Sequence, residues 1–202
     1  RLFFRQLTDD QGNTVLDNNG EAYIPNRSLG MIRSNHFVIA ADYLISKKSR
    51  LKLETYYQLI DNAPVQNISS YYSVLNYGAN FDLTFPDTLI NNGTGTNYGV
   101  ELTLERFLDK GFYYLVTGSL YQSTYKGSDG IERNTAFNGN YTSNVLIGKE
   151  FKLSKNVSDA KAVNILVLDG KFTLNGGQRY VPINIEESRN QGKTVYDFEN
   201  AF

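Results

Sequence analysis

Two carboxylates on one predicted β-strand are the first candidates for chemistry in this chain. Glu101 and Glu105 lie in the stretch GVELTLE, and because alternate side chains of a strand share a face, both point the same way. Their separation of four residues corresponds to about 13 Å at the rise of a strand. The carboxyl pair of a glycosidase lies closer, at about 5–9.5 Å. We therefore expect these carboxylates to face water and not to form a catalytic pair.

Other groups that could do chemistry lack partners at a suitable spacing. His36 is the single histidine and there is no cysteine, which removes thiolate metal sites and weakens histidine-based ones. Residues 93–95 read Gly-Thr-Gly, but no Lys-Ser/Thr pair or helix follows them as in a phosphate loop. Ser123, Ser128 and Ser143 have no G-x-S-x-G context. We therefore expect no enzyme, no cofactor and no bound metal.

Aromatic residues in loops are better candidates for binding. The chain has 15 Tyr and 12 Phe, and tyrosine suits surfaces that are half apolar and half wet. The 20 basic and 21 acidic residues nearly cancel, so there is no electrostatic case for nucleic acid. Loop aromatics and amides can hold sugars, peptides or siderophores, or the aromatics can simply pack the loops together. The possible substrate-contacting residues are Tyr71, Tyr72, Tyr77, Phe81, Arg179 and Tyr180.

The elements that must position these loops are strands with a two-residue hydrophobic period. The pattern predicts three antiparallel hairpins, at residues 36–60, 97–125 and 141–174. Each arm has about the 9–11 residues that cross a bilayer as a tilted strand. Smaller hairpins are expected near Gly12 and at residues 69–75, and the one helical signal is at residues 185–191. The sequence contains no run of about 18 apolar residues, so it predicts no transmembrane helix.

The predicted connections alternate in length. Short turns are expected after Ile45, Leu104 and Phe151, the last at residues 154–160. In an antiparallel meander, alternate connections lie at opposite ends of the sheet, so the long loops gather at one end. Outer-membrane β-barrels have this arrangement. A soluble β-sandwich or β-helix with one solvated face also alternates apolar and polar residues, so the pattern leaves these folds open. The predicted long loops are residues 1–33, 61–95, 126–140 and 175–202.

Several short motifs occur together between about residue 35 and residue 202. They are Gly-Thr-Gly-x-x-Tyr-Gly at 93–99, Glu-Leu-x-Leu-Glu at 101–105, Lys-Gly at 110–111, Gly-Ser-Asp-Gly at 127–130, Arg-Asn-Thr-x-Phe-Asn-Gly at 133–139, Gly-Lys-Glu-Phe at 148–151 and Gly-Gly-x-Arg-Tyr at 176–180. In aggregate they resemble the C-terminal half of the barrel in TonB-dependent outer-membrane receptors of the Bacteroidetes type. No single motif would carry the resemblance.

The resemblance implies an all-β fold, an antiparallel meander from a large transmembrane β-barrel that is incomplete in this chain. Residues 1–202 would then be a fragment of a barrel of about 22 strands with a plugged lumen. The protein would bind and import a nutrient across the bacterial outer membrane, with long loops extracellular and short turns periplasmic.

The resemblance also implies partners. These are outer-membrane lipid, the plug and the remaining barrel strands, TonB through the missing N-terminal part, and a surface lipoprotein, with no nucleic acid. The substrate stays open among glycan, peptide, siderophore and cobalamin. The alternative function is a soluble secreted β-sandwich that acts as a glycan-binding module.

Overall fold

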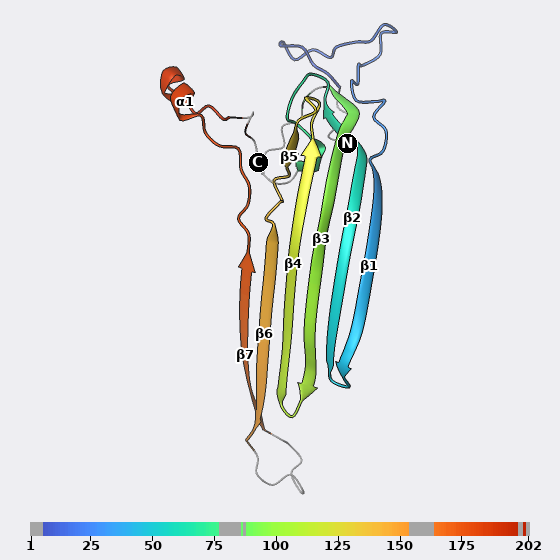
Figure 1. Cartoon of the computed structure of the whole chain (residues 1–202). Coiled ribbons are helices and arrows are strands. Elements are labelled where there is room, and N and C mark those ends of the chain that lie inside the picture. The colour runs from blue at the N-terminus through green and yellow to red at the C-terminus, as the bar shows by residue number, and fades with distance from the viewer. Residues whose placement is uncertain (1–5, 77–85, 87, 154–163, 198–199, 201–202) are drawn as a thin grey trace.

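The described part of the chain forms a single antiparallel sheet (Figure 1). The computed structural model describes residues 6–76, 86, 88–153, 164–197 and 200. The sheet order is β1-β2-β3-β4-β6-β7, and the short β5 pairs with β4. The expected all-β, antiparallel class is therefore confirmed. The strands are β1 (Arg33–Ser46), β2 (Ser49–Gln66), β3 (Leu89–Asp109), β4 (Phe112–Lys126), β5 (Glu132–Asn134), β6 (Tyr141–Lys152) and β7 (Ile165–Asn175).

The strand register aligns hydrophobic residues into rows across one face, which we call the apolar face. Because side chains alternate along each strand, residues two apart share this face and cross-strand partners extend each row. One row runs through every strand of the main path, and its neighbour toward the loop end is also largely apolar. The first row is Tyr43, Leu51, Leu104, Val116, Val145 and Phe172, and the second is Ala41, Leu53, Leu102, Gly118, Ser143 and Leu174.

The opposite face, which we call the polar face, carries the intervening residues. Its row between the two apolar rows is almost entirely charged or hydroxylated: Asp42, Lys52, Thr103, Thr117, Asn144 and Thr173. The two-residue period of the sequence thus becomes a sheet with one apolar and one polar face.

The buried hydrophobic side chains lie at one end of this sheet and not in its middle. The buried hydrophobic side chains are Ala63, Val65, Leu89, Tyr125 and Ala136, all at the end where the long loops lie (Figure 1). In the middle of the apolar face, Leu53 and Val100 are 47% exposed and Leu102 is 44% exposed. No second layer within the described residues covers the hydrophobic rows.

Two tight turns close the hairpins at the other end of the sheet. Lys47 and Lys48 connect β1 to β2, and Lys110 and Gly111 connect β3 to β4. Lys110 has φ 50° and Gly111 has φ 74°. Two consecutive positive φ values are typical of a type I′ turn, whose twist matches that of the flanking strands. The sequence prediction of short turns at these two places is confirmed.

The third connection at this end lies largely outside the described residues. The structure describes β6 as far as Lys152 and β7 from Ile165, and the start that we expect for the return strand, near residue 161, is not among the described residues. The ladder is described as far as the pairing of Lys152 with Ile165 and the hydrogen bond from Leu153 N to Asn164 O (2.9 Å). The turn predicted at residues 154–160 lies outside the described residues.

The loop predicted at residues 61–95 is shorter, because both flanking strands continue into it. Strand β2 runs to Gln66 and β3 begins at Leu89. Pro64 does not stop β2, because the register shifts on both sides of Ala63 and Asn62 takes φ 59°. Proline lacks a backbone N–H, and a strand tolerates it at such a bulge because the hydrogen-bonded ladder is interrupted there.

The smaller predicted elements had mixed outcomes. Residues 69–75 do not form the expected hairpin; instead Val65 bridges to Ser73 and the 3₁₀ helix η2 (Val74–Asn76) follows. The turn near Gly12 is present and is closed by a bridge between Thr8 and Thr14. The loop at residues 126–140 contains β5.

The predicted helix is also present, as α1 (Ile185–Gln191). The Asn184 side chain caps its first turn by accepting a hydrogen bond from Glu187 N, and Gly192 ends it in the left-handed conformation at φ 64°. Among the described residues, neither helical segment is long and apolar enough to cross a membrane.

Candidate functional site

Charged side chains on the polar face neutralise one another. Arg50 Nη2 lies 2.8 Å from Glu105 Oε2, and Arg50 Nη1 lies 3.8 Å from Asp42 Oδ2. Lys52 Nζ lies 2.6 Å from Glu54 Oε2. Glu105 is thus held by an arginine of the neighbouring strand. Exposed ion pairs of this kind contribute about 0–1 kcal/mol each.

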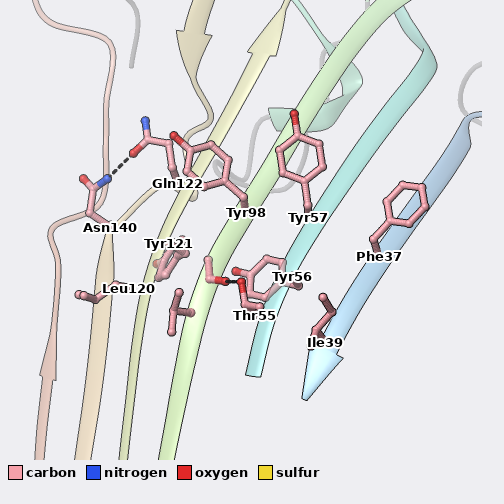
Figure 2. Close-up of a pocket in the computed structure, with 12 residues that line it drawn as sticks. Phe37, Ile39, Thr55, Tyr56, Tyr57, Tyr98, Leu120, Tyr121, Gln122 and Asn140 are labelled. Carbon is pink, nitrogen blue, oxygen red and sulfur yellow. Dashed lines mark hydrogen bonds between the residues drawn. The ribbon is translucent and has the colours of Figure 1, made fainter. Parts of the chain in front are cut away.

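A row of aromatic residues lies at the margin of the apolar face nearest the loop end. Phe37, Tyr57 and Tyr98 lie in one cross-strand row, and the rings of Tyr57 and Tyr98 stack with centroids 6.1 Å apart. Figure 2 shows these rings beside Ile39, at the edge of an open apolar groove. Gln122 follows in the same row and accepts a hydrogen bond from Asn140 Nδ2 at 2.7 Å.

A second group of aromatic residues lies near the turn end of the same face. Tyr114 pairs with Arg106, which is eight residues along β3 from Tyr98. Phe112 lies 6.0 Å from Tyr114 between ring centroids, and Lys149 Nζ lies 6.0 Å from the Phe112 ring. Arg106 and Lys149 are the basic residues that interrupt the apolar pattern of this face, and both lie at this margin. Aromatic and basic residues thus meet where the hydrophobic rows end.

Tyr71 and Tyr72 lie in a hydrogen-bonded cluster of two loops at the loop end. Residues 67–76 contact the segment between β4 and β5 through Ser128, whose Oγ accepts from Ser70 N at 3.0 Å and donates to Ile68 O at 2.5 Å. Both tyrosines are partly buried. Their position supports loop packing, which was the other possible role of the loop aromatics, more than direct contact with a substrate.

Ionisable groups inside this loop cluster are buried with their partners. Arg133 Nη1 lies 2.8 Å from Asp129 Oδ2, and both side chains are largely buried. Tyr125, near the tip of β4, is 1% exposed. Burial raises the pKa of Tyr125 to about 12, against the opposing effects of Arg133 and a hydrogen bond with Asn76. Burial also raises the pKa of Tyr71. The cluster therefore buries ionisable groups at the loop end together with their partners.

Arg179 and Tyr180 line a pocket that residues 138–141 and 176–180 form beyond the ends of β6 and β7. Its volume is about 380 Å³, within the range of small-molecule sites of roughly 300–1,000 Å³. Arg179 Nε donates to Asn138 O and its Nη2 donates to Asn140 Oδ1, both at 2.9 Å. Tyr180 is 76% exposed. This pocket is the candidate functional site.

The sequence did not single out the amide side chains at this site. Asn134, Asn138 and Asn140 are linked by hydrogen bonds, as Asn138 Nδ2 donates to Asn134 Oδ1 at 2.7 Å and Asn140 Nδ2 donates to Asn138 Oδ1 at 3.3 Å. The spacing of these asparagines in RNTAFNGN was a usable signal. Tyr77 and Phe81, the other candidates, lie outside the described residues.

The described residues contain no group of three or more His, Cys, Asp or Glu side chains that could hold a metal ion. No protein-family model matches the chain, and neither a curated protein nor a solved structure matches it.

Proposed function

We propose that this chain is part of a TonB-dependent receptor that binds a nutrient and imports it across the outer membrane. In this proposal the sheet is wall from a large transmembrane β-barrel, and the loop end supplies extracellular binding surface. Opening of the path through the barrel depends on a plug and on energy from TonB, which the resemblance implies lie elsewhere in the receptor. The resemblance to TonB-dependent receptors, carried by motifs such as those at residues 93–99 and 101–105, supports the choice of this family.

The exposed apolar face is the observation that carries this proposal. Its two central rows cross six strands, yet Leu53, Leu102 and Val100 remain exposed to nearly half of their surface. A continuous apolar patch of this kind on a protein in water marks an interaction site or an aggregation hazard. Lipid hydrocarbon is a solvent in which such a face is stable without a second layer.

The height of the apolar face also supports a membrane position. From Tyr98 to Arg106 is eight residues, which is about 27 Å along a strand. At the barrel tilt of about 40°, this becomes about 21 Å across the membrane, close to the apolar band of about 25 Å in outer-membrane barrels. Aromatic girdles flank that band in such barrels, and Tyr98 and Tyr114 lie at its two limits here.

The edges of the sheet fit a place within a larger barrel. The outermost strands, β1 and β7, are exposed along their whole length, and each has a neighbour on one side only within the described residues. Long edge strands with unpaired backbone groups are templates for further pairing, and backbone groups in lipid must be paired. Further barrel strands on both sides would meet this requirement.

A soluble β-sandwich remains the alternative, as a secreted glycan-binding module. A sandwich buries its apolar face against a second sheet about 10 Å away. The described residues form one sheet, so a facing sheet would have to come from outside them. If the protein remained monomeric and cooperatively folded in buffer without detergent, this alternative would be favoured.

A pair of arginine substitutions tests the lipid-facing assignment. Leu102 lies in the middle of the apolar face, and Thr103 lies next to it on the polar face. In the complete receptor refolded into lipid vesicles, Leu102→Arg should lower the free energy of unfolding by about 2–4 kcal/mol, because the charge enters hydrocarbon near the midplane. Thr103→Arg should change it by less than about 1 kcal/mol.

The measurement is denaturant unfolding followed by circular dichroism, together with the membrane fraction that each variant enters in cells. Gly118 lies beside Leu102 in the same row, so Gly118→Arg is a second lipid-facing variant from a neighbouring strand. Equal tolerance of arginine at residues 102 and 103 would contradict the barrel proposal.

A further inference from the structure

Arg179 carries a charge that its own surroundings do not neutralise. Its two hydrogen-bond acceptors, the Asn138 carbonyl and the Asn140 carboxamide, are both neutral. No carboxylate of the described residues forms a salt bridge with it. The side chain is also partly shielded from water. A partly buried guanidinium without a counter-ion favours an anionic partner, and its fork geometry matches a carboxylate.

The hydrogen bonds of Arg179 hold it without using all of its donors. Nε and Nη2 are engaged at 2.9 Å each, which leaves Nη1 without a partner among the described residues. The acceptor Asn140 is in turn fixed, because its Nδ2 donates to Gln122 Oε1 at 2.7 Å. The guanidinium is therefore oriented before a ligand arrives, which lowers the ordering cost of binding.

Glycine residues give a ligand close access to the backbone of this pocket. A Cβ on Gly176 would lie 1.5 Å from Gly139 O, so the two segments touch backbone to backbone. A Cβ on Gly177 would meet nothing within 4 Å, so there is open space beside it. Ligand sites typically hold a ligand with a few polar groups that point toward it. Here these groups would be the exposed backbone groups and the oriented Arg179 side chain.

The rest of the lining favours a sugar over a peptide. Tyr180 supplies an aromatic ring, and Asn140 and Gln178 supply carboxamides. No aliphatic side chain lines the pocket, so an apolar peptide side chain has no complement there. Tyrosine rings combine an apolar face with a polar hydroxyl, which complements the C–H faces and hydroxyl groups of a pyranose.

We infer that the pocket at residues 138–141 and 176–180 binds a carboxylate-bearing sugar, a uronate unit of an anionic glycan, with Arg179 as the carboxylate-binding residue. This inference rests on the proposed function, because that proposal makes the loop end extracellular and open to such a ligand. It narrows the imported nutrient to acidic carbohydrate.

Calorimetry on the complete receptor in detergent tests the inference with defined probes. The ligands are trigalacturonate and trimannuronate, and the matched neutral probe of each is its own methyl ester, which keeps the rings and loses the charges. At least one of the two acidic sugars should bind at least about tenfold more tightly than its own ester, a difference of about 1.4 kcal/mol. Equal affinity of acid and ester would overturn the role of the carboxylate.

Variants of Arg179 identify the group that carries the preference. Arg179→Gln should remove the preference for acid over ester, and Arg179→Lys should retain part of it, because lysine keeps the charge but not the fork. Arg189→Gln in α1 removes a positive charge elsewhere in the same segment and should leave binding unchanged. Arg179 also contacts Asn138 and Asn140, so its substitution can loosen the loops. Amide hydrogen exchange of each variant is therefore compared with that of the wild type. If Arg179→Gln loosens the loops, the affinities of Arg179→Lys decide.

The outcomes separate this inference from the proposed function. If neither uronate binds while the protein is in the outer membrane, the inference fails and the proposed function stands. If triglutamate binds as tightly as the uronates with the same dependence on Arg179, the sugar assignment is wrong. If the protein is absent from the outer membrane, the proposed function itself fails, whatever the affinities are.

Discussion

At the scale of single residues, the candidate pocket depends on a contact that only glycine permits. Gly176 N donates to Tyr141 O at 2.9 Å, and its Cα lies so close to Gly139 that a Cβ would be 1.5 Å from a carbonyl oxygen. That oxygen belongs to the backbone and cannot swing away as a flexible side chain would. The two segments of the pocket wall can therefore approach this closely only because residue 176 has no side chain.

Gly176→Ala should separate the two segments and loosen the pocket. Overpacking of this kind costs typically about 1–3 kcal/mol, and the amides of residues 138–141 should exchange faster with deuterium. Gly177→Ala is the matched control, because its Cβ meets nothing within 4 Å, and it should change stability by less than about 0.5 kcal/mol. Similar exchange in both variants would show that the contact does not support the pocket.

Tyr125 gives a prediction about pH. Because its pKa is raised from 10.0 to about 12 by burial, the fold favours the neutral phenol. The stabilisation is complete below about pH 10 and is lost as pH rises toward 12. At 1.36 kcal/mol per pKa unit, the loss is about 2–3 kcal/mol.

Tyr125→Phe should remove this part of the pH dependence. The comparison is denaturant unfolding of wild type and variant in detergent at about pH 9.5 and about pH 11.5, outside the range where carboxylates titrate. An equal loss of stability in both proteins would mean that Tyr125 ionises without opening the loop cluster.

At the scale of elements, local signals were enough to predict the strands. The two-residue period of Leu51, Leu53 and their partners, and the Lys110-Gly111 turn, act within a few residues of chain. The cap of α1 at Asn184 is also local. Prediction failed where a distant contact decides the structure. Asn91 lies in the loop predicted at residues 61–95, but it belongs to β3, and its side chain bonds Gly30 and Asn62, 61 and 29 residues away.

The candidate site shows the same division. Arg179 and Tyr180 are binding candidates because of their residue types. Figure 1 shows that the chain continues from the end of β7 toward α1 on the side of the sheet where the long loops lie. Their partner segment could not be predicted, since Asn138 and Arg179 are 41 residues apart. Tyr71 and Tyr72 have the same aromatic character, but they are partly buried and follow Ser70, which is hydrogen-bonded to Ser128 and Asp129.

The loop at residues 67–76 should lose its attachment when Ser128 is changed. Ser128→Ala removes the acceptor for Ser70 N and the donor to Ile68 O. Each such bond contributes about 0.5–1.5 kcal/mol, so deuterium exchange at Ser70 should be roughly 2- to 12-fold faster per bond lost. Ser119→Ala on the polar face is the control and should leave this loop unchanged; unchanged exchange in Ser128→Ala would show that other contacts hold the loop.

At the scale of the whole molecule, the distribution of buried residues is opposite to that of a protein folded in water. The buried side chains, such as Val65 and Tyr125, support loops, while the hydrophobic rows at the centre of the sheet are open. A sheet that buries its loop end and exposes its apolar centre is stable if hydrocarbon surrounds that centre. The same arrangement gives the molecule two chemically different ends, tight turns at one and a hydrogen-bonded loop cluster at the other (Figure 1).

The barrel proposal assigns these two ends to opposite sides of the membrane, and labelling can test that assignment. The chain has no cysteine, so a single introduced thiol reports one position. Lys110→Cys lies in the turn between β3 and β4, and Lys193→Cys lies just after α1 at the loop end. Both are exposed positions and both substitutions remove one positive charge.

In intact cells, a membrane-impermeant maleimide should label residue 193 and not residue 110; after the outer membrane is permeabilised, both should react. Labelling of residue 110 in intact cells would reverse the orientation, and equal labelling of both without permeabilisation would mean that no membrane separates the two ends of the sheet.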